Sequence, residues 1–371
     1  MKICILLPSL VGGGAEKLHI WLAKNWIEHG HEISFLILDD HKVAGTLKPM
    51  IPDSSQLDVI GEKRLRKTLL PITKYLRKEK VDILLAPMWP MTVIAVIARF
   101  LSRSKAKIVI SDHTNLSASR QSELKVSRLI LSLTIAIFYR LADSIITVSK
   151  GVRDDIAALG RISESAINVI YNPPGISNVE NHRDYSRINL GWQPQFKYKI
   201  LGVGSLIRQK NFSNLIIAFS LLPLTTREQS QLIILGEGIE RKKLEILIQS
   251  LSLEDQIFLP GFVIDPAPWF ISADLFVLSS SWEGFGIVLV EAMQSKLPIV
   301  STNCNSGPAE ILNNGEFGSL VACDNPEALS RAIDESLCCG HDLDKLLARS
   351  KDFSLEKAGQ DYLDIFSRLL Q

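Results

Sequence analysis

The stretch A-D-L-F-V-L-S-S-S-W-E-G-F-G-I-V-L-V-E-A, residues 273–292, decides the fold of this chain. Its apolar residues 275–278 are typical of a buried strand, and the serines and glycines after them are typical of a turn. Residues 286–295 then have the composition of a helix. Strand, turn and helix in this order form the unit of a parallel α/β sheet, whose ligands bind at the carboxyl ends of the strands. The stretch therefore predicts that Glu283 lies in a loop at this edge and that Glu291 lies inside the following helix.

The position of Glu291 has two interpretations. A glutamate in a core-facing helix, between Val290 and Ala292, costs free energy unless another group hydrogen-bonds to it. The alternative is a solvated glutamate on an amphipathic helix. The stretch taken alone does not decide between a ligand-binding carboxylate and a surface one.

Strand and helix patterns alternate along the whole chain. An apolar run at residues 2–10 is followed by a glycine turn and a helix over about 15–29. Further strands of the first half are expected at 31–38, 81–86, 107–111 and 144–148. A second series begins at Tyr198, with strands expected at 199–204, 231–235, 257–259, 274–278, 298–300 and 319–321. This alternation implies right-handed βαβ units and parallel sheets.

A polar segment without periodicity, Asn178–Pro194, separates the two series and indicates an interdomain linker. We therefore predict an α/β protein with two doubly wound, Rossmann-like domains, at residues 1–185 and 186–353. The last helix starts near Ser354, and residues 354–371 are expected to pack back on the first domain. Two such sheets facing each other leave one natural ligand site, the cleft between them.

Composition excludes several classes of protein. The hydrophobic fraction of 46% and the charged fraction of 22% are those of a soluble globular protein. Five cysteines without metal-ligand spacing argue against a disulfide framework or a zinc site. No secretory signal is recognisable, and the longest largely apolar run, Leu129–Tyr139, is far shorter than the roughly 20 residues that a membrane span needs. We expect a cytoplasmic protein that does not cross the membrane but is able to lie on its cytoplasmic face.

The small net charge of +1 is unevenly distributed. Residues 1–180 contain 24 Lys and Arg against 17 Asp and Glu, so they carry +7, and the rest of the chain carries −6. Residues 63–80 alone hold eight basic side chains among apolar ones. Basic amphipathic stretches bind anionic membrane surfaces, although solvated helix faces explain the same pattern. The first half is therefore expected to meet an anionic partner, with no indication of nucleic-acid binding.

Two glycine-rich turns precede predicted helices. Gly12-Gly13-Gly14 follows the first strand, and Gly204-Ser205 follows the first strand of the second half, with Arg208 and Lys210 close behind. Backbone N–H groups at a helix N-terminus bind phosphate, and two cations before a helix are favourable only if an anion lies near them. The alternatives are a tight turn without a ligand and ordinary surface basicity. The dinucleotide fingerprint G-x-G-x-x-G is absent, which disfavours a nicotinamide oxidoreductase.

Two other motifs have weaker support. His113 follows the strand at 107–111, but a lone histidine is more often structural than catalytic. Asp342-Leu343-Asp344 matches the D-x-D pattern of metal-dependent sugar transferases. It lies far from the strand ends, so we interpret Asp342 as the start of a helix and expect no metal site.

These motifs resemble those of the family 4 glycosyltransferases, retaining enzymes with the GT-B fold, and the resemblance covers nearly the whole chain. Its most specific part is Glu283-Gly284-Phe285-Gly286 with Glu291-Ala292, the family's E-x7-E signature. The other matching segments are Gly12–Glu16, Val148–Lys150, Asn172-Pro173, Gly204–Lys210, Leu235–Gly238, Pro260–Phe262 and Ser306–Leu312.

The resemblance implies roles for individual residues. Glu283 would hold the donor sugar, Arg208 or Lys210 would neutralise its diphosphate, and His113 would lie against the sugar. Glu291 would bind the ribose hydroxyls of the nucleotide. Negative charge develops on the departing diphosphate, and fixed cations with helix N-termini stabilise it without a metal. In this family retention is explained by front-face attack, in which the leaving phosphate assists deprotonation of the acceptor.

The remaining implied site residues line the donor and the acceptor. Donor contacts are implied for Gly13, Gly14, Gly204, Ser205, Gly236, Gly238, Phe285, Gly286, Ile287 and Glu291. The acceptor side is implied to include Gly12 and Glu16. One departure concerns the phosphate clamp, because family members often have arginine where this chain has Ser205, and we expect Arg208 to substitute for it.

The sequence therefore predicts a metal-independent hexosyltransferase of bacterial type without a cofactor. The expected donor is a UDP-linked hexose or N-acetylhexosamine, and the expected acceptor is a lipid-linked saccharide in cell-surface polysaccharide or glycan assembly. Two alternatives remain: a nucleotide-sugar 2-epimerase with the same architecture, and an inactive nucleotide-binding subunit that serves assembly.

Overall fold

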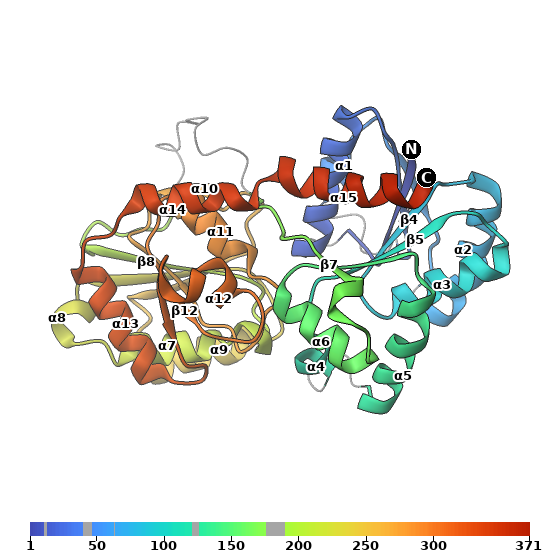
Figure 1. Cartoon of the computed structure of the whole chain (residues 1–371). Helices are drawn as coiled ribbons and strands as arrows, with labels where there is room; N and C mark the ends of the chain where they lie inside the picture. The colour runs from blue at the N-terminus through green and yellow to red at the C-terminus, as the bar shows by residue number, and fades with distance from the viewer. Residues whose placement is uncertain (11–12, 40–46, 63, 121–125, 176–189) are drawn as a thin grey trace. The chain divides into compact units, whose positions relative to one another are not determined.

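The computed structural model describes residues 1–371 except 11–12, 40–46, 63, 121–125 and 176–189. The chain divides into two compact units (Figure 1). The N-terminal unit consists of Met1–Gly175 together with Ser354–Gln371, and the C-terminal unit of Ile176–Phe353. Most of the expected linker and Gly12 lie outside the described residues.

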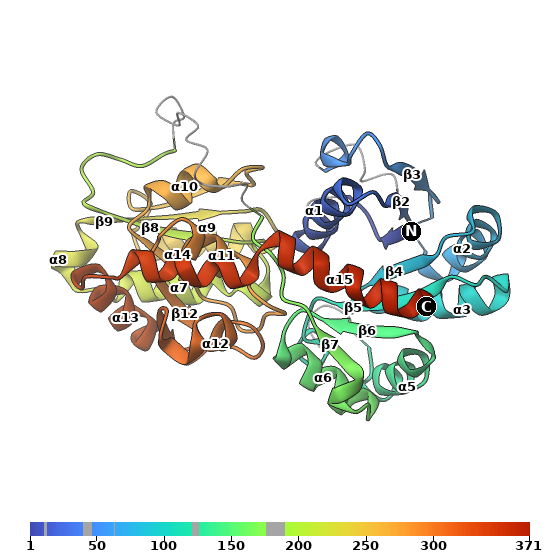
Figure 2. The same cartoon turned by 45° about the horizontal axis from the view of Figure 1, so that its top comes forward.

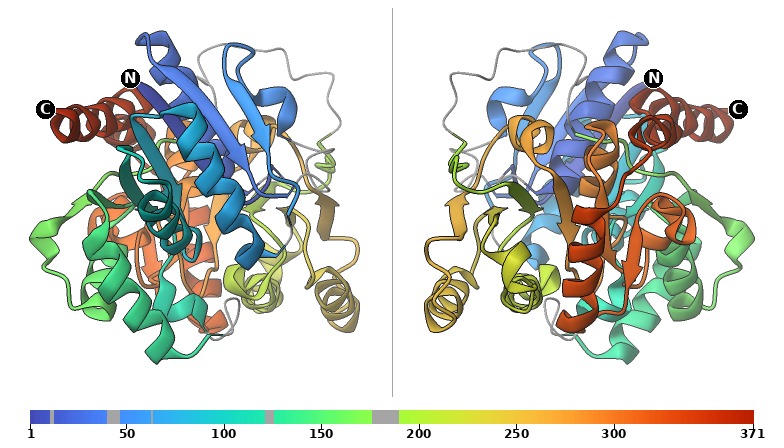
Figure 3. Two further views of the ribbon diagram at one scale, coloured as in Figure 1. Left: turned by 90° about the vertical axis from the view of Figure 1, so that its right-hand side faces the viewer. Right: turned by 90° about the vertical axis from the view of Figure 1, so that its left-hand side faces the viewer.

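The N-terminal unit contains a seven-stranded parallel sheet with the strand order β3-β2-β1-β4-β5-β6-β7. Its strands are β1 (Lys2–Leu7), β2 (Glu32–Ile37), β3 (Gln56–Val59), β4 (Ile83–Pro87), β5 (Lys107–Asp112), β6 (Ser144–Thr147) and β7 (Ile167–Val169). Its helices are α1 (Gly14–Glu28), α2 (Leu65–Glu79), α3 (Met91–Ser102), α4 (Leu116–Ser119), α5 (Arg128–Phe138), α6 (Lys150–Gly160) and α15 (Leu355–Leu370), with 3₁₀ turns η1 (Lys48–Met50), η3 (Tyr139–Leu141) and η4 (Glu164–Ala166). Figure 3 shows this sheet and its helices from the side of α2 and α3.

The C-terminal unit repeats the design with six parallel strands in the order β10-β9-β8-β11-β12-β13. The strands are β8 (Tyr198–Val203), β9 (Ser230–Leu235), β10 (Ile257–Gly261), β11 (Leu275–Leu278), β12 (Ile299–Thr302) and β13 (Ser319–Val321). The helices are α7 (Phe212–Ser220), α8 (Leu224–Arg227), α9 (Arg241–Ser250), α10 (Ala267–Ser272), α11 (Ile287–Gln294), α12 (Pro308–Ile311), α13 (Pro326–Cys338) and α14 (Leu343–Ser350), with 3₁₀ turns η6 (Arg208–Lys210), η7 (Asn313–Gly315) and η8 (Lys351–Phe353). Both sheets reverse their strand order once, between β1 and β4 and between β8 and β11, and the crevice for ligands in such sheets lies at that point.

The opening stretch folds as predicted. Residues 275–278 form β11, whose side chains are all buried, and Ile287–Gln294 form α11. Helix starts expected at Ser354 and Asp342 are also present, because each side chain accepts a hydrogen bond from the backbone N–H three residues later.

Other elements differ from expectation. The strands β3 and β7 were not predicted, because both are short edge strands with partly exposed residues and therefore lack a continuous apolar run. Helix α5 spans Arg128–Phe138 and continues directly as η3 to Leu141. Helix α10 was not predicted either, because its six residues are too few for a helical period.

Candidate functional site

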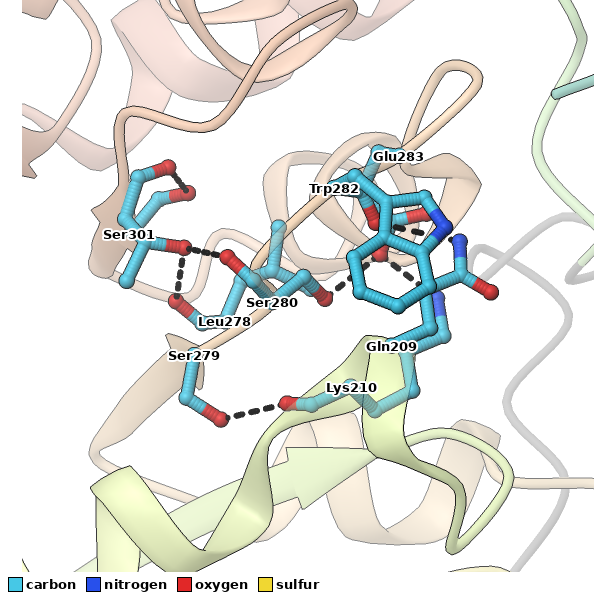
Figure 4. A network of polar contacts seen from close by, with 9 residues as sticks. Gln209, Lys210, Leu278, Ser279, Ser280, Trp282, Glu283 and Ser301 are labelled. Carbon is cyan, nitrogen blue, oxygen red and sulfur yellow. Dashed lines mark hydrogen bonds and ion pairs between the residues drawn. The ribbon is translucent and has the colours of Figure 1, made fainter. Parts of the chain in front are cut away.

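The loops after β8 and β11 lie at the reversal point of the C-terminal sheet and are hydrogen-bonded to each other (Figure 4). Ser279 Oγ donates to the carbonyl oxygen of Lys210 at 2.9 Å, and the backbone N–H of Ser281 donates to that of Gln209 at 2.9 Å. Gln209 Nε2 in turn donates to the carbonyl oxygen of Trp282 at 3.0 Å. These contacts hold η6 against the end of β11, although about 70 residues separate the two in the sequence.

The centre of this network is an ion pair between Lys210 and Glu283. The ammonium nitrogen of Lys210 lies 2.6 Å from Glu283 Oε1, and Ser280 Oγ donates to the same oxygen at 2.6 Å. The side chains of Lys210 and Glu283 are only 17% and 6% exposed. Thr302 Oγ1 donates to the carbonyl oxygen of Ser280 at 2.6 Å and so supports the serine from β12. Glu283 thus has two side-chain partners at a buried position, which fix the orientation of its carboxylate. Removal of Lys210 or Glu283 leaves the other charge buried without compensation.

The turn that leads from Glu283 into α11 depends on glycine. Gly286 is the N-cap of α11 and has φ = 94°. This left-handed backbone conformation favours glycine. The ring of Phe285 is 2% exposed and packs edge-on against Phe353, with ring centroids 5.6 Å apart. Ile287 begins α11, and Glu291 lies inside the helix with 8% of its surface exposed. Glu291 is therefore buried, which excludes the interpretation as a solvated surface residue.

The loops after β8 and β9 pack closely. The backbone N–H of Leu206 donates to the carbonyl oxygen of Glu237 at 2.9 Å. Gly236 has φ = 146°, and a Cβ at this position would lie 1.9 Å from the carbonyl oxygen of Gly204. Only glycine allows this approach. Gly238 also lies against Leu206, and Ser205 remains exposed between these turns.

Arg208 and Lys210 belong to the same 3₁₀ turn but have different surroundings. Arg208 is exposed and lines a cavity of about 600 Å³. The other lining residues are Ile207, Asn211, Phe212, Ser213, Glu240, Lys243, Leu244, Ser281, Trp282 and Asp324. Lys210 instead contacts Glu283, so the two cations that the sequence treats as alternatives for one clamp do not share one partner.

In the N-terminal unit, α1 starts at Gly14 and Gly13 is its N-cap, without a side chain that caps the helix. The first backbone N–H groups of a helix without a side-chain cap can bind an anion, but in α1 that of Glu16 already contacts the carboxylate of Glu16 itself. The carboxylate of Glu16 lies against Gly13, and burial raises its pKa. Gly13, Gly14 and Glu16 thus lie together at the start of α1.

His113 follows β5 and belongs to a polar chain inside the N-terminal unit. Its Nε2 lies 2.9 Å from Ser111 Oγ, and the same oxygen lies 2.9 Å from the hydroxyl of Tyr362 on α15. The ring of His113 also contacts that of His19 edge-on, with centroids 5.0 Å apart. His19 Nδ1 lies 2.7 Å from the carbonyl oxygen of Ala15 in the first turn of α1.

The protonation of these two histidines follows from their partners. A carbonyl oxygen only accepts, so Nδ1 of His19 carries its proton, and burial lowers the pKa of His19 to about 4. Burial also lowers the pKa of His113 well below its usual value, so its ring is neutral at pH 7. If Tyr362 donates to Ser111 and Ser111 donates to His113, each hydroxyl hydrogen has an acceptor. The proton of His113 then resides on Nδ1, an atom that is buried.

No group of three or more His, Cys, Asp and Glu side chains is arranged to hold a metal ion within the described part of the chain. Asp342, the first residue of the D-x-D match, caps α14 through its side chain.

Sequence reasoning missed several residues of both networks. Ser280, Gln209 and Asn211 support the Lys210–Glu283 pair or its loops, and Ser111 and Tyr362 contact His113. Serines that directly follow a buried strand were visible at 279–281, and this signal points to Ser280. Tyr362 had no comparable signal, because it lies 251 residues from Ser111.

Comparison with known proteins identifies the family. The family model for glycosyl transferases group 1 matches residues 192–352, and that for glycosyltransferase family 4 matches residues 12–173. Together the two models account for most of both units. The chain belongs to the family 4 glycosyltransferases with the GT-B fold.

Two relatives match this glycosyltransferase over nearly their full length. It is 27% identical to an N-acetylgalactosamine-N,N'-diacetylbacillosaminyl-diphospho-undecaprenol 4-alpha-N-acetylgalactosaminyltransferase of Campylobacter jejuni, with 98% of each chain covered. It is 25% identical to the lipopolysaccharide core biosynthesis glycosyltransferase LpsE of Rhizobium meliloti, with 96% of each covered.

Solved structures of the same fold include Anabaena HepE in complex with UDP, with a TM-score of 0.81, 22% identity and coverage of 99% of this chain and 100% of HepE. HepE with UDP-glucose has a TM-score of 0.82 at the same identity and coverage.

Proposed function

We propose that this glycosyltransferase moves a hexose or N-acetylhexosamine from a UDP-sugar to a lipid-linked saccharide, with retention of configuration and without a metal. The observation that carries the proposal is the buried contact of Lys210 and Ser280 with Glu283 in the E-x7-E segment. The similarity to a Campylobacter transferase whose substrate is linked to diphospho-undecaprenol supports a lipid-linked acceptor. The fold shared with HepE, which binds UDP and UDP-glucose, supports a UDP-linked donor.

In the proposed reaction, the bond between the anomeric carbon and the diphosphate oxygen breaks, and its electron pair stays on the diphosphate. The acceptor hydroxyl attacks from the same face and transfers its proton to the departing phosphate oxygen. A fixed cation near the diphosphate, for which Lys210 is the proposed residue, stabilises the charge that develops there. Glu283 would hold a sugar hydroxyl, and Ser280 keeps its carboxylate oriented. Glu291 would bind the ribose.

The proposal is tested with Glu283→Ala and Lys210→Ala and a direct assay of UDP-sugar consumption with a lipid-diphosphate saccharide acceptor. Each variant loses a charged hydrogen bond worth about 1.5–3 kcal/mol, so turnover should fall on the order of 10- to 100-fold. Lys296→Ala is the matched control, because Lys296 forms a 2.6 Å ion pair with Asp344 on the exposed surface of the same unit. The control should keep the rate of the parent protein.

The same assay separates the alternatives. A 2-epimerase converts the donor sugar without any acceptor, and an inactive subunit binds UDP without turnover. Unchanged turnover in both site variants would contradict the assignment of these residues.

A further inference from the structure

The outer face of α5 and η3 is apolar and exposed. Its exposed residues follow one another at intervals of four, which places them on one side of the helix. They are Leu129 (69% exposed), Leu133 (50%), Ile137 (52%) and Leu141 (41%). The opposite side already fills the core, since Leu131 and Ile135 are fully buried. The exposed stripe is therefore not needed to attach the helix to its own unit.

The stripe continues onto the end of α3. Phe100 and Leu101 are 54% and 47% exposed, and Arg99 links them to η3. The guanidinium of Arg99 lies over the ring of Phe100 at 5.0 Å, and its Nη2 donates to the carbonyl oxygen of Leu141 at 3.3 Å. The α3–α5 apolar surface is defined here as Phe100, Leu101, Leu129, Ile130, Leu133, Ile137 and Leu141. Contiguous apolar patches of this kind mark contacts with proteins or membranes.

Basic side chains surround this surface. Arg128 begins α5, Arg140 lies in η3, and Arg103 and Lys105 follow α3; all four are exposed. Helix α2 packs beside α3 (Figures 1 and 2) and donates a hydrogen bond from Arg77 to the carbonyl oxygen of Leu101. The further exposed basic residues of α2 are Arg66, Lys67, Lys74 and Lys78.

The acidic side chains beside the surface do not cancel this charge. Glu79 contacts Lys2 and Lys78, and Asp143 contacts Arg99 and Lys107. Glu79 therefore offsets only Lys78 among the border cations, and Asp143 offsets none of them. An apolar stripe with a basic border is complementary to a bilayer whose surface carries anionic headgroups.

The length of α5 determines how it can contact such a bilayer. With 11 residues, α5 is about 16 Å long, which is half of the roughly 30 Å hydrocarbon core. None of the described helices is long and apolar enough to cross a membrane. A short helix with one apolar face lies in the plane of the interface, with that face among the acyl chains.

We propose that the α3–α5 apolar surface inserts into the headgroup region of an anionic bilayer and that its basic border binds the lipid phosphates. This contact brings the N-terminal unit to the membrane, where a lipid-linked acceptor is found, but it depends on neither the donor nor the acceptor.

The test is flotation of the full chain with vesicles of phosphatidylcholine containing 30% phosphatidylglycerol, without saccharide or nucleotide. The triple variant Leu129→Ser, Leu133→Ser, Ile137→Ser should lower the partition coefficient at least tenfold, since three apolar side chains no longer insert. The matched control is Ile239→Ser, Ile246→Ser, Ile264→Ser, because these residues are 88%, 66% and 65% exposed but lie on the C-terminal unit. This control should bind like the parent protein.

A second series tests the charge. The variant Arg103→Gln, Lys105→Gln should lower partition roughly fivefold for each charge removed, and the parent protein should bind pure phosphatidylcholine vesicles far more weakly. Equal binding of the parent and the triple serine variant would overturn the proposal. A parent protein that is dimeric by light scattering, with a monomeric triple variant, would assign the surface to a second copy of the chain instead. Because no sugar is present, a failure here is distinct from a failure of the proposed transfer reaction.

Discussion

At the scale of the residue, Ser111 contacts a predicted site residue, His113. The sequence places His113 at the carboxyl edge of the first sheet, and the structure confirms that position. It also shows that Nε2 of His113 is occupied by Ser111, which is bonded to Tyr362 from the far end of the chain. The role of His113 against the donor sugar stays a prediction, but its neutral form follows from burial.

Asp112, directly before His113, should make stability depend on pH. Burial raises its pKa from 3.8 to about 7, an effect that Tyr139 and the backbone of Trp89 partly offset. The folded protein therefore binds a proton more tightly than the unfolded chain between these values, and this contribution to stability is lost as pH rises from about 4 to 7. The variant Asp112→Asn has no such titrating group. The free energy of unfolding of the variant, minus that of the parent protein, should therefore rise between pH 4 and pH 7, by roughly 4 kcal/mol at most.

Urea unfolding of both proteins at pH 4.5, 6 and 8 measures this difference. Burial lowers the pKa values of His19 and His113, so their contribution to the pH dependence of stability has the opposite sign. Both histidines are present in both proteins, and their contributions cancel in the comparison. Asp154→Asn, at an exposed residue of the same unit, controls for the substitution itself. A difference for Asp112→Asn that stays constant from pH 4.5 to 8 would show that Asp112 is ionised in the fold throughout.

At the scale of the element, α15 belongs to the N-terminal unit although it ends the chain. Phe366 is fully buried, and its ring and that of Tyr362 contact Trp26 on α1 at centroid distances of 5.4 and 5.7 Å. Trp26 Nε1 also donates to the carbonyl oxygen of Gly359 at 3.1 Å. A Cβ at Gly359 would lie 2.1 Å from the side-chain oxygen of Asn25, so the small residue permits the close approach of α15 to α1.

Phe366→Ala should therefore destabilise the N-terminal unit by about 3–5 kcal/mol, because it removes a buried ring and leaves a cavity. Chemical denaturation followed by tryptophan fluorescence detects the change through Trp26. Leu370→Ala is the control on the same helix, since Leu370 is 41% exposed and its removal should cost little. A similarly small effect of Phe366→Ala would mean that α15 does not contribute to the stability of the unit.

At the scale of the whole molecule, the sheets of the two units share the order of their first six strands, and the units carry opposite net charge. The basic half carries the α3–α5 apolar surface, and the acidic half carries the Lys210–Glu283 pair. This division fits a protein whose first unit meets an anionic membrane and whose second unit holds the nucleotide, as proposed above.

The nucleotide preference should be measurable as the increase in the unfolding temperature of the full chain when each nucleotide is added. UDP should stabilise it by about 2.7 kcal/mol at a hundred times the dissociation constant, and more than GDP or ADP at equal concentration. The shift should be the same with magnesium and with EDTA, because the proposed phosphate contacts are side-chain cations and backbone N–H groups. A shift that requires magnesium would contradict the metal-independent mechanism, and a larger shift with GDP would contradict the UDP donor.

The sequence by itself determined the two series of strands and helices, the position of Glu283 in a loop and that of Glu291 in a helix. These features depend on local composition: apolar runs form buried strands, and glycines and serines form the turns between them. The short edge strands β3 and β7 escaped prediction because a strand with partly exposed residues has no such run.

Only the tertiary structure decided which side chains meet. Lys210 pairs with Glu283 across 73 positions of the sequence, and Tyr362 contacts Ser111 across 251. Arg208 lies on the same turn as Lys210 but lines a cavity instead. Such contacts follow from how parallel strands bring distant loops to one edge of a sheet, and no local pattern encodes them. The burial of Glu291, which excluded a surface role, is likewise a property of packing around α11 and not of its own sequence.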